Sequence, residues 1–149
     1  MKTILVIPPL KYNCNFWGAL RTAEAFGVTE LCFIGYTNLN RIPKGSMKTY
    51  KHIKVSNFNT VEECMDYLIS KNIKIISIEN SDNSILLNRF IFPANIALVM
   101  GHERLGVPDY ILNRTIALKI PQFGLVKCLN TTVSISIVLY ERFKQKLKI

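Results

Sequence analysis

The stretch IALVMGHERLG at residues 96–106 decides how the rest of the chain is interpreted. Its first half, 96–100, has the length and the continuous apolar character of a strand that is buried on both faces of a sheet. The strand then ends abruptly in a glycine followed by charged residues, and Gly106 lies close behind. In open α/β sheets ligands bind beyond the carboxyl ends of the parallel strands. We therefore expect this tip to form one wall of a ligand pocket.

Short β-rich runs alternate with helical patterns along the chain, which predicts an α/β fold with a mostly parallel sheet flanked by helices. The expected strands are 4–7, 30–35, 73–79, 95–100 and 115–120. Helices are expected over 16–26, over 61–71 and, briefly, from Pro108. Thr60 and Glu63 form a capping box at the start of the second helix. SDNS at 81–84 is expected to be a surface loop.

The last segment, 128–149, is ambiguous from its sequence. Residues 131–138 favour a strand by propensity, whereas an apolar stripe at helical spacing favours a helix and consists of Leu129, Val133, Ile137, Tyr140, Phe143 and Leu147. We interpret the segment as a helix. No internal repeat, low-complexity tract or linker divides the chain, so residues 1–149 are expected to form a single domain.

The charge balance points to a polyanionic partner. Nineteen Lys and Arg against ten Asp and Glu give a formal net charge of +9, which attracts nucleic acid, although a generally basic proteome would produce the same excess. The candidate RNA-facing loop contains Arg41, Lys44, Lys48, Lys51 and Lys54, and further lysines at 144, 146 and 148 crowd the C-terminal end.

Cysteine usage and hydropathy exclude several classes of protein. The four cysteines, at 14, 32, 64 and 128, form no Cys-x-x-Cys pair and do not cluster with histidine, so neither a metal site nor a disulfide framework is predicted. No apolar run approaches the roughly 18 residues that a membrane span needs, and prolines 8 and 9 interrupt the first apolar run. A soluble, cytoplasmic protein with reduced thiols is expected.

Three loops carry the residues that indicate chemistry: 13–21, 101–106 and 121–130. Their glycines let the backbone approach a ligand closely or adopt a positive φ, which suits a nucleoside-shaped guest. Nothing in the chain matches G-x-x-x-x-G-K-[ST], and no G-x-G-x-x-G follows the first strand. A triphosphate or an ordinary dinucleotide is therefore not the expected ligand.

These loops resemble, in order and spacing, three motifs of the TrmH/SpoU branch of SPOUT RNA methyltransferases. The first is Asn15-x-x-Gly18-x-x-Arg21-Thr-Ala-x-Ala-Phe-Gly27, the second is Gly101-x-Glu103-x-x-Gly106, and the third is Ile120-Pro121-x-x-Gly124-x-x-x-Cys128-Leu129-Asn130. The resemblance extends from residue 4 to about residue 143, nearly the whole chain. Each motif alone is weak, but the three together are specific.

The resemblance implies the SPOUT (α/β knot) fold, with a C-terminal trefoil knot and a homodimer whose active sites lie at the interface. It also implies that S-adenosylmethionine is the cofactor. By analogy, the residues around the cofactor are Ile78, Glu79, Gly101, Ile120, Cys128 and Leu129.

The implied reaction is methyl transfer from the sulfonium to a ribose 2′-hydroxyl of RNA, with transfer RNA favoured over ribosomal RNA by analogy with compact relatives. The resemblance assigns catalysis to Arg21 of the partner subunit, with Asn15, Glu103 and Asn130 holding the arrangement. Arg21 is assigned either as the base or as a clamp. A guanidinium stays protonated at ordinary pH, which suits a clamp on the neighbouring phosphate that stabilises developing oxyanion character.

Two departures from the family pattern keep alternatives open. Cys128 stands where serine is common, and Gln122 stands where methionine is common. They leave room for a non-catalytic, RNA-binding knotted protein, and an unrelated α/β nucleotide-binding enzyme is a third possibility.

The individual site residues also have simpler explanations. Arg21 can be a solvated helix-face residue, Glu103 can cap the helix near Pro108 or pair with Arg104, and Asn130 can be only a helix cap. His102 is interpreted as a surface or packing residue. Phe16 and Trp17 are assigned to the core or to a dimer interface.

Overall fold

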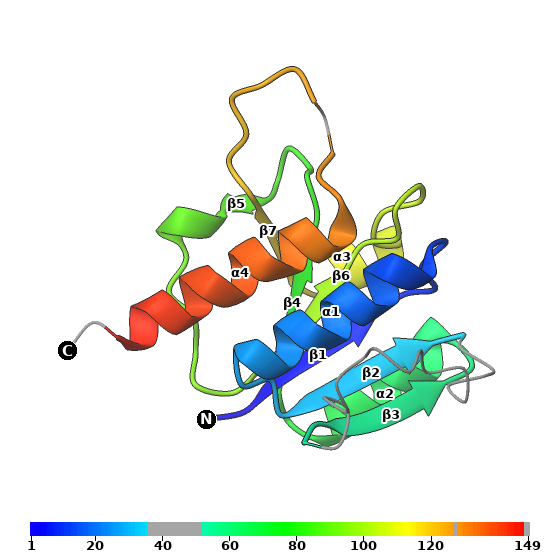
Figure 1. The fold of residues 1–149 in the computed structure, drawn as a ribbon. Helices are drawn as coiled ribbons and strands as arrows, with labels where there is room; N and C mark the ends of the chain where they lie inside the picture. Colours follow the sequence, from blue (N-terminus) through cyan, green and yellow to red (C-terminus); the bar gives the residue numbers. More distant parts are fainter. Residues whose placement is uncertain (36–51, 127, 148–149) are drawn as a thin grey trace.

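The computed structural model describes residues 1–35, 52–126 and 128–147 (Figure 1). Most of the basic loop predicted to face RNA, including Arg41, Lys44, Lys48 and Lys51, lies outside the described residues, as does Lys148. In the described part of the chain, no helix is both long and apolar enough to cross a membrane. The described side chains also contain no group of three or more His, Cys, Asp or Glu residues that could hold a metal ion.

The described residues form a seven-stranded sheet in the order β3-β2-β1-β6-β4-β7-β5, and every neighbouring pair is parallel. The strands are β1 (Thr3–Ile7), β2 (Glu30–Ile34), β3 (Lys54–Phe58), β4 (Lys74–Ile78), β5 (Ile85–Leu86), β6 (Ile96–Met100) and β7 (Ile116–Lys119). β1, β2 and β6 are buried at every position, as expected for strands covered on both faces.

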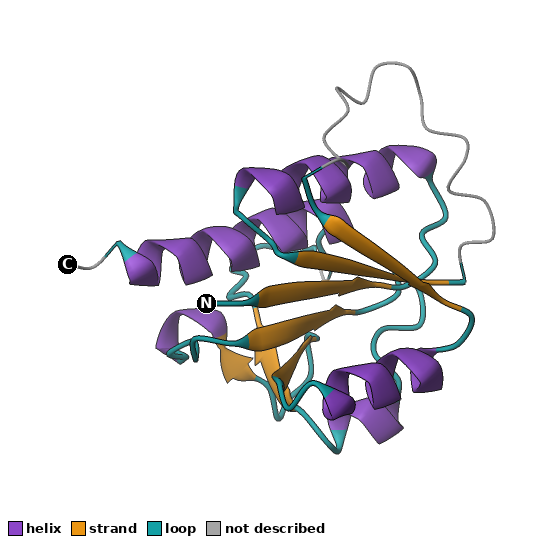
Figure 2. Ribbon diagram, turned by 90° about the horizontal axis from the view of Figure 1, so that it is seen from below, coloured by secondary structure: helices purple, strands orange, loops and turns teal. Residues whose placement is uncertain are grey.

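Helices cover both faces of the sheet (Figure 2). The helices α1 (Asn13–Ala25) and α4 (Thr131–Lys146) pack together over one face, where their apolar side chains join those of the strands in the larger core cluster. The helices α2 (Val61–Ser70) and α3 (Asp109–Leu112) cover the other face with a second cluster. A short 3-10 helix, η2 (Leu87–Arg89), follows β5.

The predicted α/β class and all five predicted strands are confirmed. Half of the predicted capping box of α2 is present, because Thr60 Oγ1 accepts from the Glu63 N–H at 3.2 Å. The Glu63 carboxylate accepts from the Asn59 N–H at 2.9 Å, one residue before the N-cap, instead of from Thr60. α1 begins three residues earlier than the predicted start at residue 16, and Pro108 is the N-cap of α3. Two strands were not predicted: β3 is a partly exposed edge strand of mixed polarity, and β5 has two residues.

The predicted C-terminal helix is confirmed as α4, but most of its predicted apolar stripe is exposed, and only Ile137 of the stripe packs against the larger core cluster. Val133, Tyr140, Phe143 and Leu147 are exposed, by 46%, 57%, 38% and 61% respectively. The sheet is instead covered by a second face, whose buried apolar members are Ile135, Val138 and Leu139. α4 is therefore apolar on two sides. On the more exposed side, the rings of Tyr140 and Phe143 contact Phe26 of α1 edge-on, and a large part of this side remains exposed.

Arg142 fixes the last turns of α4 to the sheet. Its guanidinium is buried and donates to Thr3 Oγ1 at 3.0 Å and to the carbonyl oxygens of Pro93 and Ala94, both at 2.8 Å. Burial lowers the pKa of Arg142 to about 10, so the side chain stays charged at neutral pH. Gln145 adds a hydrogen bond from its amide to the Phe90 carbonyl at 2.9 Å.

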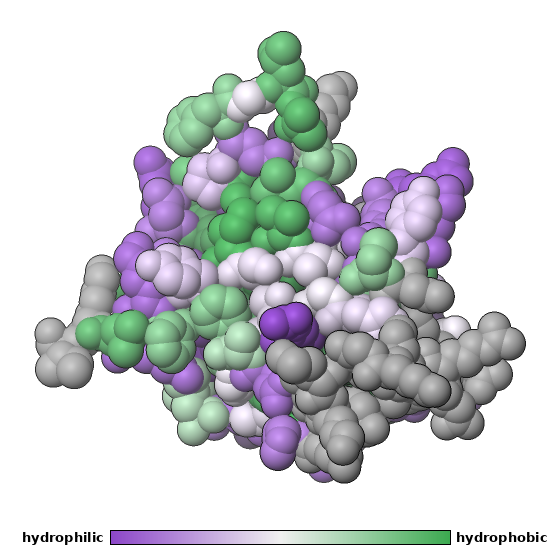
Figure 3. All heavy atoms as spheres, viewed as in Figure 1, coloured by the Kyte–Doolittle hydropathy of each residue, from purple (hydrophilic) through white to green (hydrophobic). Residues whose placement is uncertain are grey.

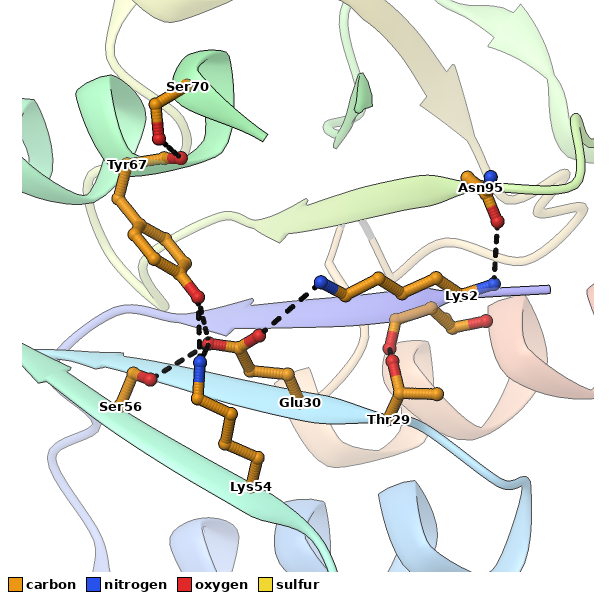
Figure 4. A network of polar contacts seen from close by, with 9 residues as sticks. Lys2, Thr29, Glu30, Lys54, Ser56, Tyr67, Ser70 and Asn95 are labelled. Atoms are coloured by element: carbon orange, nitrogen blue, oxygen red, sulfur yellow. Dashed lines mark hydrogen bonds and ion pairs between the residues drawn. The ribbon is translucent and has the colours of Figure 1, made fainter. Parts of the chain in front are cut away.

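A second polar network lies at the amino-terminal ends of β1, β2 and β3 (Figure 4). Glu30, 1% exposed, accepts from Tyr67 at 2.6 Å, Ser56 at 2.8 Å and Lys54 at 2.9 Å, and Lys2 lies 3.9 Å away. Burial raises the pKa of the Glu30 carboxyl, but the hydrogen bonds from Tyr67, Lys54 and Ser56 outweigh burial and hold the pKa below its usual value. Lys54, assigned from sequence to the RNA-facing loop, thus begins an edge strand and is held by Glu30.

Candidate functional site

A cavity of about 440 Å³ opens at the carboxyl ends of β4, β6 and β7, a size that fits a small-molecule ligand. The strand register brings these ends together, because Ile78 pairs with Met100 on one side and with Leu118 on the other. All six residues predicted from sequence to surround a cofactor line this cavity: Ile78, Glu79, Gly101, Ile120, Cys128 and Leu129. Glu103 lines it too. The structure therefore brings together three segments that are distant in sequence.

Glu79 explains why two glycines stand in the second motif. Its Oε2 atom accepts from the Val107 N–H at 2.7 Å, and its Oε1 atom accepts from the Asn80 N–H at 3.0 Å. A Cβ atom at Gly106 would lie 2.5 Å from Glu79 Oε2, and one at Gly101 would lie 3.0 Å from it. Gly106 also has a φ of +67°, which favours glycine.

Three of the four predicted catalytic residues form one hydrogen-bonded group. The Asn15 amide donates to Glu103 Oε1 at 2.5 Å, and the Asn130 amide donates to Asn15 Oδ1 at 3.0 Å. The backbone N–H of Lys11 donates to Glu103 Oε2 at 3.2 Å. Glu103 is thus held by Lys11 before α1 and by Asn15 in its first turn, and the alternatives that it caps α3 or pairs with Arg104 are wrong.

Asn130 has two roles in this geometry. Its Oδ1 atom accepts from the backbone N–H groups of Thr132 at 2.8 Å and Val133 at 3.4 Å, so it is the N-cap of α4. Those acceptor contacts leave its amide nitrogen to donate to Asn15. The cap therefore links the start of α4 to α1 and, through Asn15, to Glu103.

Gly18 of the first motif is required by the close approach of α1 and α4. A Cβ atom at Gly18 would lie 2.7 Å from Thr132 Cγ2. The Thr132 side chain is held in place because its hydroxyl donates to the Asn15 carbonyl at 3.0 Å. Sequence reasoning did not single out Thr132, whose importance depends on a contact across more than a hundred residues.

Arg21 stands apart from the other predicted site residues. It lies about two helical turns beyond Asn15 on α1, is exposed, and does not line the cavity. No described residue forms a hydrogen bond or ion pair with its guanidinium. A single chain therefore does not bring Arg21 to the cavity.

The loop between β7 and α4 projects from the molecule and is largely apolar (Figure 3). Gln122, Cys128 and Leu129 line the cavity from this loop. At its tip, Phe123 and Leu125 are fully exposed and Val126 is 67% exposed. All four cysteines are free, and of these only Cys128 lines the cavity.

Comparison with known proteins gives consistent matches over most of the chain. The profile described as "SpoU rRNA Methylase family" matches residues 2–140. The tRNA (guanosine(18)-2′-O)-methyltransferase of Escherichia coli K12 is 23% identical over 134 residues, which cover 89% of this chain and 58% of that protein. The mouse tRNA (guanosine(18)-2′-O)-methyltransferase TARBP1 is 26% identical over 157 residues, covering 98% of this chain and 10% of that protein. The chain thus spans less than two thirds of these relatives.

Solved structures share the same fold. The A. aeolicus TrmH/SpoU tRNA modifying enzyme superposes with a TM-score of 0.86 at 23% identity, covering 97% of this chain and 75% of that one. A structure described under "2-OH methylation of C/U34 on tRNA" has a TM-score of 0.83 at 25% identity, covering 97% of this chain and 91% of that one. The methyltransferase AviRb of Streptomyces viridochromogenes, in complex with AdoMet, has a TM-score of 0.78 at 19% identity, covering 100% of this chain and 61% of that one.

Proposed function

This chain belongs to the SpoU rRNA methylase family, and we propose that it is an S-adenosylmethionine-dependent RNA methyltransferase acting on a ribose 2′-hydroxyl. One observation carries the proposal: the second and third motif segments and the end of β4 line one cavity, and the first motif joins them through the hydrogen bonds of Asn15 with Glu103 and Asn130. The names of the relatives, which are 2′-O-methyltransferases of tRNA, support the same reaction.

The residues of the cavity fit the cofactor. Ile78, Ile120 and Leu129 supply an apolar lining suited to a flat aromatic base, and Gly101 and Gly106 keep side chains out of the wall. A bound S-adenosylmethionine supplies a methyl group that its sulfonium already activates. The chain must therefore mainly align the donor with the ribose, exclude water and assist loss of the hydroxyl proton.

We assign Arg21 to the active site of the partner subunit in a homodimer. Its exposure on α1, away from its own cavity, supports a composite site, and the exposed apolar stripe of α4 supplies a surface for the second copy. A guanidinium remains protonated, so Arg21 clamps the phosphate next to the target ribose and stabilises the oxyanion that develops there. The phosphate then assists proton removal.

The C-terminal trefoil knot also belongs to the proposal. The last turns of α4 are fixed to the segment before β6 by Arg142 and Gln145. These contacts fix where the helix ends, and the threading itself is proposed from membership of the SpoU family.

Transfer RNA is the proposed substrate, because the relatives act on tRNA by name and the net charge of +9 favours a polyanion. The test incubates the protein with labelled methyl donor and either total transfer RNA or ribosomal RNA. Labelled transfer RNA is expected. Tight RNA binding without cofactor binding or label would instead support the non-catalytic RNA-binding protein.

A mixing experiment tests the composite site. Arg21→Ala removes the clamp, and Cys128→Trp blocks the cavity from an exposed position, with Cys128→Ser as its matched control. Arg21→Ala and Cys128→Trp should each be inactive when tested alone. Random pairing of the two variants makes half of the dimers mixed, and each mixed dimer has one intact site out of two. The mixture should therefore recover about a quarter of the wild-type activity. If mixed dimers are verified to form and the mixture is still inactive, Arg21 does not act from the partner subunit.

A further inference from the structure

We propose that His102 and Glu79 are positioning residues that pre-form the cavity wall 101–107 for the cofactor, with neither acting by direct contact. The inference rests on the proposed function for the identity of the ligand. It changes the interpretation of both residues, because the family resemblance placed Glu79 around the cofactor and His102 was interpreted as a surface or packing residue.

The wall is a tight turn whose base is anchored by the buried side chain of Val107, whereas its tip has no such apolar support. The backbone N–H of His102 donates to the Gly106 carbonyl at 3.0 Å, and the Gly106 N–H donates back to the His102 carbonyl at 2.9 Å. Between them, Arg104 is exposed and Leu105 is 83% exposed, so no buried side chain at the tip anchors the turn. Its shape must therefore depend on polar contacts.

His102 supplies such contacts inside the turn. Its Nδ1 atom accepts from the backbone N–H of Arg104 at 3.1 Å and from that of Leu105 at 3.3 Å. This geometry requires the tautomer in which Nδ1 carries no proton. The imidazole thus satisfies two amides at the tip that the turn's own carbonyls do not reach.

Glu79 holds the base of the same turn. Its Oε2 atom accepts from the Val107 N–H at 2.7 Å and fills the space beside both motif glycines. Its other oxygen accepts from the Asn80 N–H at 3.0 Å. Both carboxylate oxygens are therefore used by the backbone, which suits a brace better than a ligand-binding group.

Together the two side chains and the turn itself satisfy the backbone N–H groups at 102 and 104–107. A wall held in this way is ordered before the ligand arrives, so binding does not have to order it. The wall also presents few free donors, which favours a guest that brings its own N–H groups, as an adenine amine does.

The test compares His102→Asn with His102→Ala. An asparagine at this position can accept the same two N–H groups through its side-chain oxygen, as in an Asx turn, whereas alanine cannot. Binding of S-adenosylhomocysteine is measured by calorimetry, and amide exchange of 101–107 is measured without ligand. We expect His102→Ala to bind about tenfold more weakly than wild type and to exchange faster at 104 and 105. His102→Asn should resemble wild type in both measurements, and Glu79→Ala should accelerate exchange at 107.

Other outcomes separate the two proposals. Unchanged exchange and affinity in His102→Ala would overturn the brace, and equal loss of affinity in both His102 variants with normal exchange would assign a direct contact instead. If wild-type protein does not bind S-adenosylhomocysteine, the proposed function fails, and the exchange data still decide whether the two side chains hold the turn.

Discussion

Replacing Gly18 by alanine should separate the two helices that assemble the site. The new methyl group would lie 2.7 Å from Thr132 Cγ2, well inside van der Waals contact. Thr132 cannot turn away without losing the hydrogen bond that its hydroxyl donates to the Asn15 carbonyl at 3.0 Å. The helices must therefore move apart.

The magnitude follows from two opposing effects. Overpacking costs about 1–3 kcal/mol, while alanine gains about 1 kcal/mol over glycine inside a helix. Gly18→Ala alone should therefore lower the free energy of unfolding by up to about 2 kcal/mol. Thr132→Ser removes Cγ2 and keeps the hydroxyl, so in that background Gly18→Ala should be neutral or stabilising.

Urea unfolding of the four proteins in this cycle gives the coupling energy between the two sites. We expect a coupling energy of about 1–3 kcal/mol, with the double variant more stable than the sum of the two single changes predicts. Methyl transfer should follow the same pattern, because Gly18→Ala shifts Asn15 relative to Asn130. If Gly18→Ala costs the same with and without Thr132 Cγ2, the steric reasoning is wrong.

Arg142→Met should lower the free energy of unfolding by about 3 kcal/mol, because it leaves buried carbonyl oxygens without donors; equal stability in urea would refute this. Glu30→Gln should cost about 2 kcal/mol at pH 7 by weakening charge-assisted hydrogen bonds. Because the pKa of Glu30 is held below its ordinary value, its contribution to the free energy of unfolding is fully present above the unfolded-state pKa. The difference in stability between wild type and Glu30→Gln should therefore vanish as the pH falls through the folded-state pKa of Glu30. If the proposed homodimer forms through the α4 stripe, Tyr140→Glu should give a folded, inactive monomer in light scattering, and an active dimer of this variant would exclude the stripe as the interface.

The sequence was sufficient to predict the sheet class, the strand 96–100 and the convergence of three loops, because parallel strands deliver their carboxyl ends to one edge. It could not predict which face of α4 meets the sheet, since two apolar faces compete and only packing selects between them. The brace by Glu79 was equally inaccessible, because it depends on a hydrogen bond across 28 positions. The proposed place of Arg21 is in the site of a second chain, and periodicity carries no information about that chain.

The most direct test of the central claim is nucleoside mass spectrometry of transfer RNA incubated with the protein and S-adenosylmethionine. The account predicts a new nucleoside methylated on its ribose oxygen, absent with Arg21→Ala. A methyl group on a base, or unmodified RNA from a protein that binds both cofactor and RNA, would contradict it.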